Sequence, residues 1–309
     1  MNNNRLSKDR IQMSTFNTIG FIGVGVMGEP ICRHLATKSG ARVIAHDRDN
    51  APLQRLAEHN VTAVSLETIA EQADIIFMSL PSGEIVRNVI RGDGAENKGL
   101  LELCRSGQLI VDLSTSPVDL SRELSAELSK IGVEFADSPV MRTRAAAEAG
   151  TLAVPVGADD AIFGRIEPLL STFASDVVHA GGVGAGQVVK ILNNMVLYET
   201  VLALAEARAI GIRAGVDPDK LFSALSVGSA DSFALRNHGM KAIAPQVFPE
   251  KAFPVVYAKK DLQYAVGLAD QVGVDATGAK NLIACFDKAI AAGHGDKYAP
   301  AISLVFEGK

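Results

Sequence analysis

The first half of the chain repeats one pattern, in which a short apolar run is followed by a turn of glycine or small polar residues and then by an amphipathic stretch. Apolar runs of strand length lie at residues 18–23, 41–45, 75–80, 109–113, 132–136 and 152–156, and a further run ends at His179. Short apolar runs bounded by turns are typical of buried strands, and strands that alternate with helices build a parallel sheet. The pattern therefore predicts an α/β domain of the Rossmann type, with a doubly wound sheet.

After Gly186 the hydrophobic spacing becomes helical. It predicts one long helix that ends near Ile212, followed by helices at residues 217–225, 255–272 and 277–292, without a clear strand. We expect a disordered tail at residues 1–16, the sheet domain at 17–181 and an all-α domain at 182–309, with the long helix joining the two domains.

Composition narrows the class of protein. Of the 309 residues, 48% are hydrophobic and 21% charged, and the formal net charge is −5, which argues against a nucleic-acid or anionic membrane partner. The polar N-terminus does not resemble a signal peptide, and the apolar run at residues 195–205 is too short and mixed for a membrane span. Three widely spaced cysteines and six unpaired histidines predict neither disulfides nor a metal site, so a cytoplasmic location is expected.

A glycine motif follows the first predicted strand. Gly23, Gly25 and Gly28 have the G-x-G-x-x-G spacing, with Val26 and Met27 inside the turn, and a predicted helix follows at residues 29–38. This spacing allows a tight turn and close approach of a pyrophosphate to a helix N-terminus. A glycine turn without a phosphate is the structural alternative.

The second strand is followed by His46, Asp47 and Arg48, and Asp47 comes nineteen residues after Gly28. An acid at this place can accept hydrogen bonds from the adenosine ribose hydroxyls, so we expect NAD as the cofactor. Arg48 could receive a 2′-phosphate, which keeps NADP as the alternative.

Two other strands end in residues suited to ligand binding. Leu80 and Pro81 end one strand, and Ser114 and Thr115 end the next. Ligands of doubly wound sheets bind at the carboxyl ends of the strands. We expect Leu80, Pro81 and Thr115 to contact the cofactor, and Ser114 and Thr115 to contact a substrate. Helix capping before Pro117 is the alternative for the last two residues.

The stretch at residues 181–194 places a glycine-rich loop before the long helix. Gln187, Asn193 and Asn194 lie at i−3, i+3 and i+4 from Lys190, so an α-helix puts three amides and one ammonium on a single face. A lysine near a helix N-terminus can simply extend to water. We favour a catalytic ammonium, at a domain junction where pockets commonly form.

Taken together, these motifs resemble those of the β-hydroxyacid dehydrogenases, a family that includes 3-hydroxyisobutyrate dehydrogenases and tartronate semialdehyde reductases. The resemblance covers residue 19 to about residue 300. It rests on the glycine motif at residues 21–28, on Asp112-Leu113-Ser114-Thr115 and on Lys260-Asp261-Leu262. It also rests on the pattern G-x-x-G-x-G-x-x-x-K-x-x-x-N, which begins at Gly181 and contains Lys190 and Asn194. It implies a Rossmann domain, a long helix, an all-helical domain and assembly as a homodimer or homotetramer. It also suggests that Lys260 reaches the cofactor or the substrate, although a solvated lysine is the alternative.

The chain departs from the family pattern at residues 141–143. Many members have Ser-Gly-Gly there, whereas this chain has Met141-Arg142-Thr143. A Gly-Arg-Thr version is similar to the branch that reduces sulfolactaldehyde or oxidises γ-hydroxybutyrate, and this chain shares its Arg and Thr. We therefore expect Arg142 and Thr143 to bind a carboxylate or a sulfonate, since a guanidinium suits both. An exposed surface charge is the alternative for Arg142.

The predicted reaction is hydride transfer between a nicotinamide and a short β-hydroxyacid or acid semialdehyde. Burial would lower the pKa of Lys190 from about 10.4 so that it acts as general acid or base. Asn194 would orient the reacting oxygen, with help from Asn193. The alternatives are 3-hydroxyisobutyrate or tartronate semialdehyde specificity, an imine reductase, or a binding module without activity; Lys190 argues against the last two because such relatives typically lack the lysine.

Overall fold

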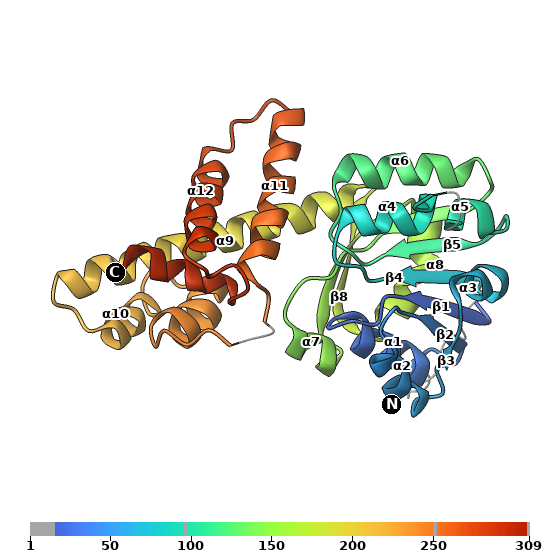
Figure 1. The fold of residues 1–309 in the computed structure, drawn as a ribbon, viewed down its shortest axis with the longest axis horizontal. Helices are drawn as coiled ribbons and strands as arrows, with labels where there is room; N and C mark the ends of the chain where they lie inside the picture. The colour runs from blue at the N-terminus through green and yellow to red at the C-terminus, as the bar shows by residue number, and fades with distance from the viewer. Residues whose placement is uncertain (1–15, 95–97, 250–251, 308–309) are drawn as a thin grey trace, which may run out of the picture. The chain divides into compact units, whose positions relative to one another are not determined.

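The computed structural model describes residues 16–94, 98–249 and 252–307, in two compact units made of residues 1–190 and 191–309 (Figure 1). The tail expected at residues 1–16 lies outside the described residues except for Phe16, which is buried.

The first unit contains an eight-stranded sheet in the order β3-β2-β1-β4-β5-β6-β7-β8. The strands are β1 (Thr18–Ile22), β2 (Arg42–His46), β3 (Thr62–Ala63), β4 (Ile75–Met78), β5 (Leu109–Asp112), β6 (Glu134–Asp137), β7 (Leu152–Gly157) and β8 (Ala174–Gly181). The first six strands are parallel, as the sequence pattern predicts for five of them, and the two-residue strand β3 was not predicted. The strand β7 instead pairs antiparallel with β6, because the connection holds only the short helix α7 (Arg144–Ala149) rather than a crossover along the sheet.

Helices cover both faces of this sheet. They are α1 (Gly28–Lys38), α2 (Asn50–Ala57), α3 (Leu66–Gln72), α4 (Gly83–Arg91), α5 (Leu100–Leu103), α6 (Val118–Ser129), α7 and α8 (Asp160–Leu170). In β4, Ile75 and Phe77 pack on the face covered by α1, α2 and α8, whereas Ile76 and Met78 pack on the face covered by α3 to α6. This alternation puts a core on each side of the sheet and leaves the strand ends for ligands.

The second unit is helical. The expected helices are present as α9 (Ala185–Arg213), α10 (Pro218–Leu225), α11 (Val255–Gln271) and α12 (Thr277–Ala291), and the helix α9 starts in the first unit. A π-helix at Leu235–Ile243 and a 3-10 helix at Ala299–Phe306 were not expected from the hydrophobic spacing. All these elements contribute to one core, which includes Phe222, Leu262 and Phe286.

The helix α9 has 29 residues and is long and apolar enough to cross a membrane by those two criteria alone. The run expected at residues 195–205 is thus only part of a longer apolar helix. One such helix is weak evidence for a membrane span, because the core helix of a globular protein meets the same criteria.

Candidate functional site

The glycine turn lies between β1 and α1 and has the shape that a dinucleotide requires. A Cβ on Gly28 would overlap the carbonyl oxygen of Gly23, and Gly23 itself has φ +89°, so both positions favour glycine. Gly25 has open space around its Cα. The helix α1 begins at Gly28 without a side-chain cap, which leaves its N-terminus suited to an anion. These residues therefore fit a bound pyrophosphate.

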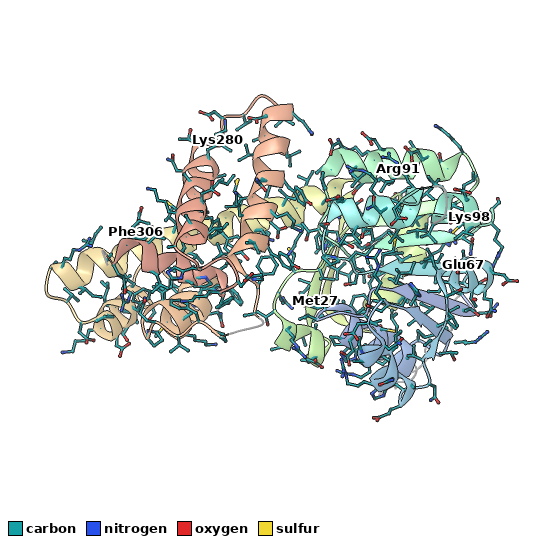
Figure 2. All side chains as sticks on the ribbon, in the orientation of Figure 1. Met27, Glu67, Arg91, Lys98, Lys280 and Phe306 are labelled. Atoms are coloured by element: carbon teal, nitrogen blue, oxygen red, sulfur yellow. The ribbon has the colours of Figure 1, made fainter. Side chains whose placement is uncertain are left out.

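The two other residues of the turn differ in exposure. Val26 is 54% exposed, whereas Met27 packs partly against the core at the start of α1 (Figure 2). Val26 is therefore the side chain of this turn that presents most of its surface for contact with a ligand.

Asp47 fixes the conformation of the same turn. Its Oδ2 accepts a hydrogen bond of 2.7 Å from the backbone N–H of Val24, and its Oδ1 accepts one of 2.8 Å from the N–H of Asp49. Each carboxylate oxygen keeps a further lone pair, which the ribose hydroxyls of a dinucleotide can use. Arg48 beside it is exposed.

Ser114 links the carboxyl ends of β4 and β5. Its Oγ accepts from the N–H of Leu80 at 2.9 Å, and its own N–H donates to Asp112 Oδ1 at 2.9 Å. The helix-capping alternative is wrong, because α6 is preceded by Pro117 and has no side-chain cap. Ser114 is buried and Thr115 half-buried, so Thr115 presents the more accessible side chain of the pair.

Two buried carboxylates stand side by side at this edge of the sheet. Asp112 and Asp137 are paired in register at the ends of β5 and β6, and neither is exposed to solvent. Burial raises the pKa of each carboxyl from its ordinary value to about 6, against the hydrogen bonds that favour the ionised forms. Sequence reasoning did not select Asp137 as a site residue.

Asp137 holds the start of the helix α9. Its two oxygens accept hydrogen bonds from the N–H groups of Gly184 and Gln187 at 2.6 and 2.7 Å. A carboxylate at a helix N-terminus satisfies unpaired N–H groups and favours the helix dipole. The helix that carries Lys190 is therefore fixed to the sheet at its first turn, and Lys190 itself is half-buried.

Asn194 lies one turn after Lys190 on α9 and is held by α11 of the second unit. Its Nδ2 donates to Asp261 Oδ2 at 2.6 Å, and its Oδ1 accepts from Asn193 Nδ2 at 3.1 Å. Lys260 Nζ lies 3.1 Å from the other oxygen of Asp261. Asn194 and Asp261 are buried, whereas Asn193 is exposed.

Lys260 thus has a carboxylate neighbour on its own helix, and its Nζ also lies 5.2 Å from the centroid of the Tyr264 ring. Sequence reasoning did not select Asp261 as a site residue. The signal that could have found it is its place in the Lys260-Asp261-Leu262 motif, between a lysine and a buried leucine.

The side chains of Arg142 and Thr143 have structural partners. The Arg142 guanidinium donates to Thr151 O, Ser175 Oγ and Asp176 Oδ2 at 2.6, 2.8 and 2.7 Å, and its backbone has φ +83°. Thr143 accepts from Ala146 N–H and caps α7. These bonds use three of the five guanidinium N–H groups, so Arg142 would bind a substrate anion either with the other two or in exchange for its contact with Asp176.

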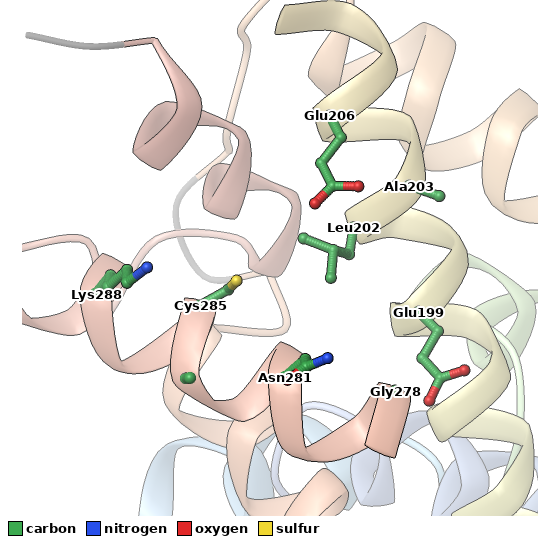
Figure 3. Close-up of a pocket in the computed structure, with 9 residues that line it drawn as sticks. Glu199, Leu202, Ala203, Glu206, Gly278, Asn281, Cys285 and Lys288 are labelled. Carbon is green, nitrogen blue, oxygen red and sulfur yellow. The ribbon is translucent and has the colours of Figure 1, made fainter. Parts of the chain in front are cut away.

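The helical unit has a groove of about 580 Å³ between α9 and α12 (Figure 3). Glu199, Leu202 and Glu206 line one wall, and Asn281, Cys285 and Lys288 line the other. Glu199 comes nine residues after Lys190 on α9, which corresponds to about 13 Å along the helix. The groove is therefore not the site of Lys190. Among the described residues there is no group of three or more His, Cys, Asp or Glu residues that could hold a metal ion.

Comparison with known proteins matches both parts of the chain. A family model described as the NAD binding domain of 6-phosphogluconate dehydrogenase matches residues 18–182, and one described as NAD-binding of NADP-dependent 3-hydroxyisobutyrate dehydrogenase matches residues 184–304.

Individual proteins match over most of their length. The 2-(hydroxymethyl)glutarate dehydrogenase of Eubacterium barkeri is 35% identical over 82% of each chain. The 2-hydroxy-3-oxopropionate reductase of Escherichia coli is 32% identical, over 83% of this chain and 86% of its own. The structure of Mycobacterium tuberculosis 3-hydroxyisobutyrate dehydrogenase with L-serine superposes with a TM-score of 0.84 at 28% identity, over 95% of this chain and 100% of its own.

Proposed function

We propose a specific reaction for this chain, which belongs to the β-hydroxyacid dehydrogenase family. The chain is an oxidoreductase that uses NAD or NADP and acts on CH–OH groups. The reaction is reversible hydride transfer between the nicotinamide and a short β-hydroxyacid or the corresponding acid semialdehyde. The nicotinamide supplies the hydride chemistry when it is bound.

The observation that carries this proposal is the pair of residues on one turn of α9. Lys190 and Asn194 are four residues apart in the helix, so both side chains are on the same face. The amide of Asn194 is held by Asp261, and the first turn of the helix is held by Asp137. An ammonium and an amide fixed in this way can hold a substrate oxygen and move one proton to or from it.

Lys190 is the proton-transfer group in this proposal. It takes the proton from the hydroxyl during oxidation and returns it to the aldehyde oxygen during reduction. The Asn194 amide nitrogen carries two N–H groups. One donates to Asp261, and the other would donate to the reacting oxygen. Asn193 donates a hydrogen bond to Asn194 Oδ1, which supports a helping role for Asn193 in this proposal.

The glycine turn would hold the cofactor with Gly23, Gly25, Val26, Met27 and Gly28. Asp47 favours NAD, because a 2′-phosphate would stand against its carboxylate. Leu80, Pro81 and Thr115 are placed along the strand ends where the cofactor is expected. Lys260 is a further cofactor or substrate contact from the helical unit.

The substrate is a small anion in this proposal, bearing a carboxylate or a sulfonate. The acids named in related proteins support this class: 2-(hydroxymethyl)glutarate, 2-hydroxy-3-oxopropionate and 3-hydroxyisobutyrate. Ser114 and Thr115 are the candidate contacts. A second arrangement, in which Arg142 and Thr143 also bind the anion, competes with their bonds to other protein groups and is distinguished by the Arg142 variants. Specificity for 3-hydroxyisobutyrate or tartronate semialdehyde is the alternative within the same class.

The enzyme acts as a homodimer or homotetramer in the cytoplasm in this proposal. Exposed apolar side chains recur along α9, namely Val189, Leu192, Val196 and Ile210. Glu199, Glu206 and Lys288 line the groove between α9 and α12. A second copy would cover this apolar surface. Sedimentation of a species above the single-chain mass of 32.5 kDa supports assembly, and that mass alone at micromolar concentration contradicts it.

The reaction itself is tested by NADH- and NADPH-dependent reduction of a panel of aldehydes. The panel contains carboxylated, sulfonated and uncharged short-chain aldehydes, together with a cyclic imine. Turnover confined to the anionic aldehydes supports the proposal. Turnover of the imine alone, or of none of these compounds, contradicts it.

A further inference from the structure

Gln187 connects the polar loop after β5 to the first turn of α9. Its Oε1 accepts a hydrogen bond from the N–H of Ser116 at 3.0 Å, and its Nε2 donates to the carbonyl oxygen of Ser114 at 2.8 Å. The side chain is completely buried. One amide therefore satisfies two backbone groups of a loop that is 71 to 73 residues distant in sequence.

Both ends of this connection are fixed independently. On the helix side, the N–H of Gln187 donates to Asp137. On the loop side, Ser116 Oγ donates to Asp112 Oδ2 at 3.1 Å, and the N–H of Ser114 donates to Asp112 Oδ1. Asp112 and Asp137 are neighbours at the ends of β5 and β6, so the loop and the start of α9 are held by adjacent strands. The side chain of Gln187 connects the start of α9 to this loop.

Gln187 also lies three residues before Lys190 on the same helix. Residues three apart stand on one helix face, so the position of Gln187 determines where the following turn lies relative to the loop. The loop carries Thr115, a candidate substrate contact, between the two residues to which Gln187 bonds.

We propose that Gln187 is a positioning residue that holds Lys190 in register with the loop at residues 114–116. This inference rests on the proposed function, because it takes Lys190 as the proton-transfer group. Gln187 itself is completely buried, and its amide oxygen and nitrogen are both bonded to the backbone of the loop. Removing its amide leaves a buried N–H and a buried carbonyl without their partner, and the loop and helix then relax apart.

Proton transfer is sensitive to such a displacement. A shift of about 1 Å between reacting groups can lower a rate by as much as about 10²-fold. We therefore expect Gln187→Met, which keeps the volume and removes both hydrogen bonds, to lower kcat about 10-fold. Cofactor affinity should change less than about twofold, because the glycine turn at residues 23–28 is not touched.

Gln108 provides a matched control in the same unit. It is also completely buried, and its amide donates to Ala70 O and Ala73 O at 2.9 and 2.6 Å and accepts from Arg105 N–H at 2.6 Å. It precedes β5, whereas Gln187 contacts the loop that follows the same strand. Gln108→Met should lower the melting temperature at least as much as Gln187→Met and leave kcat within about twofold of the wild type.

The experiment measures kcat, the NADH dissociation constant and the melting temperature for the full-length wild type, Gln187→Met, Gln108→Met and Lys190→Met. If Gln187→Met does not fold, Gln187→Glu takes its place, since it keeps the shape and the acceptor for Ser116 N–H. A kcat at least fivefold below the wild type for the folded Gln187 variant, with unchanged NADH binding and a normal kcat for Gln108→Met, supports the inference. A kcat within twofold of the wild type, or an equal loss in Gln108→Met, overturns it.

The kcat–pH profile adds a second readout. If Gln187 positions the proton-transfer group, the apparent pKa in this profile should move in the Gln187 variant and stay unchanged in Gln108→Met; an unchanged profile in both overturns the inference. Full activity of Lys190→Met would instead mean that the proposed function has failed, which separates the two outcomes.

Discussion

The side chain of Asn194 is bonded to a buried carboxylate: its Nδ2 lies 2.6 Å from Oδ2 of Asp261. A carboxylate accepts only, so this contact determines which end of the Asn194 amide is nitrogen. The orientation of the proposed oxygen-binding amide therefore depends on a residue 67 positions later in the chain.

Replacing Asp261 should impair this orientation. Asp261→Asn can donate as well as accept, so the Asn194 amide can turn over, and we expect kcat to fall about 10-fold with little change in the NADH dissociation constant. The matched control is Asp287→Asn on α12, where an exposed aspartate pairs with Lys259. Equal kcat values for the two variants would show that Asp261 does not act through Asn194.

The buried carboxyls predict a pH dependence of stability. Burial raises the pKa of Asp112 and Asp137 from 3.8 to about 6 in the folded protein, so between these values the folded state binds more protons than the unfolded state. Their contribution to the free energy of unfolding is therefore largest at low pH, where it stabilises the folded state. This stabilisation decreases as the pH rises towards 6, and it does not change further above that pH. The expected slope is at most about 1.4 kcal/mol per pH unit for each titrating group.

Asp112→Asn removes one of these groups. In urea unfolding at pH values from 4.5 to 8, the difference in unfolding free energy between wild type and variant should move in favour of the variant as pH rises to about 6, and then stay constant. Asp219→Asn, an exposed position on α10, is the control. A wild-type-to-variant difference that is independent of pH would contradict the raised pKa.

Variants of Arg142 distinguish a substrate-binding role of this side chain from a structural role. Its three hydrogen bonds, together with φ +83°, favour a structural role in which Arg142→Ala lowers the specificity constant by the same factor for charged and uncharged aldehydes. Arg142→Gly, which suits the positive φ, should lose less than the alanine variant. A loss of about 10-fold or more confined to anionic aldehydes would instead support the substrate-anion role that the sequence suggests.

Asp47 predicts the cofactor preference. We expect a higher kcat/KM with NADH than with NADPH, and Asp47→Ser should narrow that ratio by at least about 10-fold, since the carboxylate that repels a 2′-phosphate is removed. The measurement is steady-state kinetics with both cofactors at fixed ionic strength. A wild-type preference for NADPH would mean that Arg48 dominates the site.

The features that the sequence predicted are local ones. The glycine turn, the parallel strands β1, β2, β4, β5 and β6, and the spacing of Lys190 and Asn194 follow from neighbouring residues and helix or strand periodicity. The two-residue strand β3 is too short to give such a pattern and was not predicted. The partners of Gln187, Asn194 and Arg142 were not predictable in this way, because they come from other elements of the fold. For Arg142, the resemblance to one branch of the family and the affinity of a guanidinium for anions suggested a ligand, whereas the structure pairs it with Asp176.

The antiparallel direction of β7 was also not predictable from neighbouring residues. Its apolar pattern is that of any buried strand, and only the short connection through α7 determines that it runs back along β6. The spacing of apolar residues indicates which side chains of a strand are buried, whereas the direction of the strand depends on the path of the connecting chain.

The central claim, that Lys190 transfers the proton, is tested most directly by single-turnover reduction of an anionic aldehyde by the Lys190→Met variant. Lys130→Met, at the exposed end of α6, serves as the control. We expect Lys190→Met to keep its melting temperature and NADH affinity and to lose at least about 10²-fold in rate, while the control keeps the wild-type rate. A Lys190→Met rate within threefold of the wild type would contradict the account.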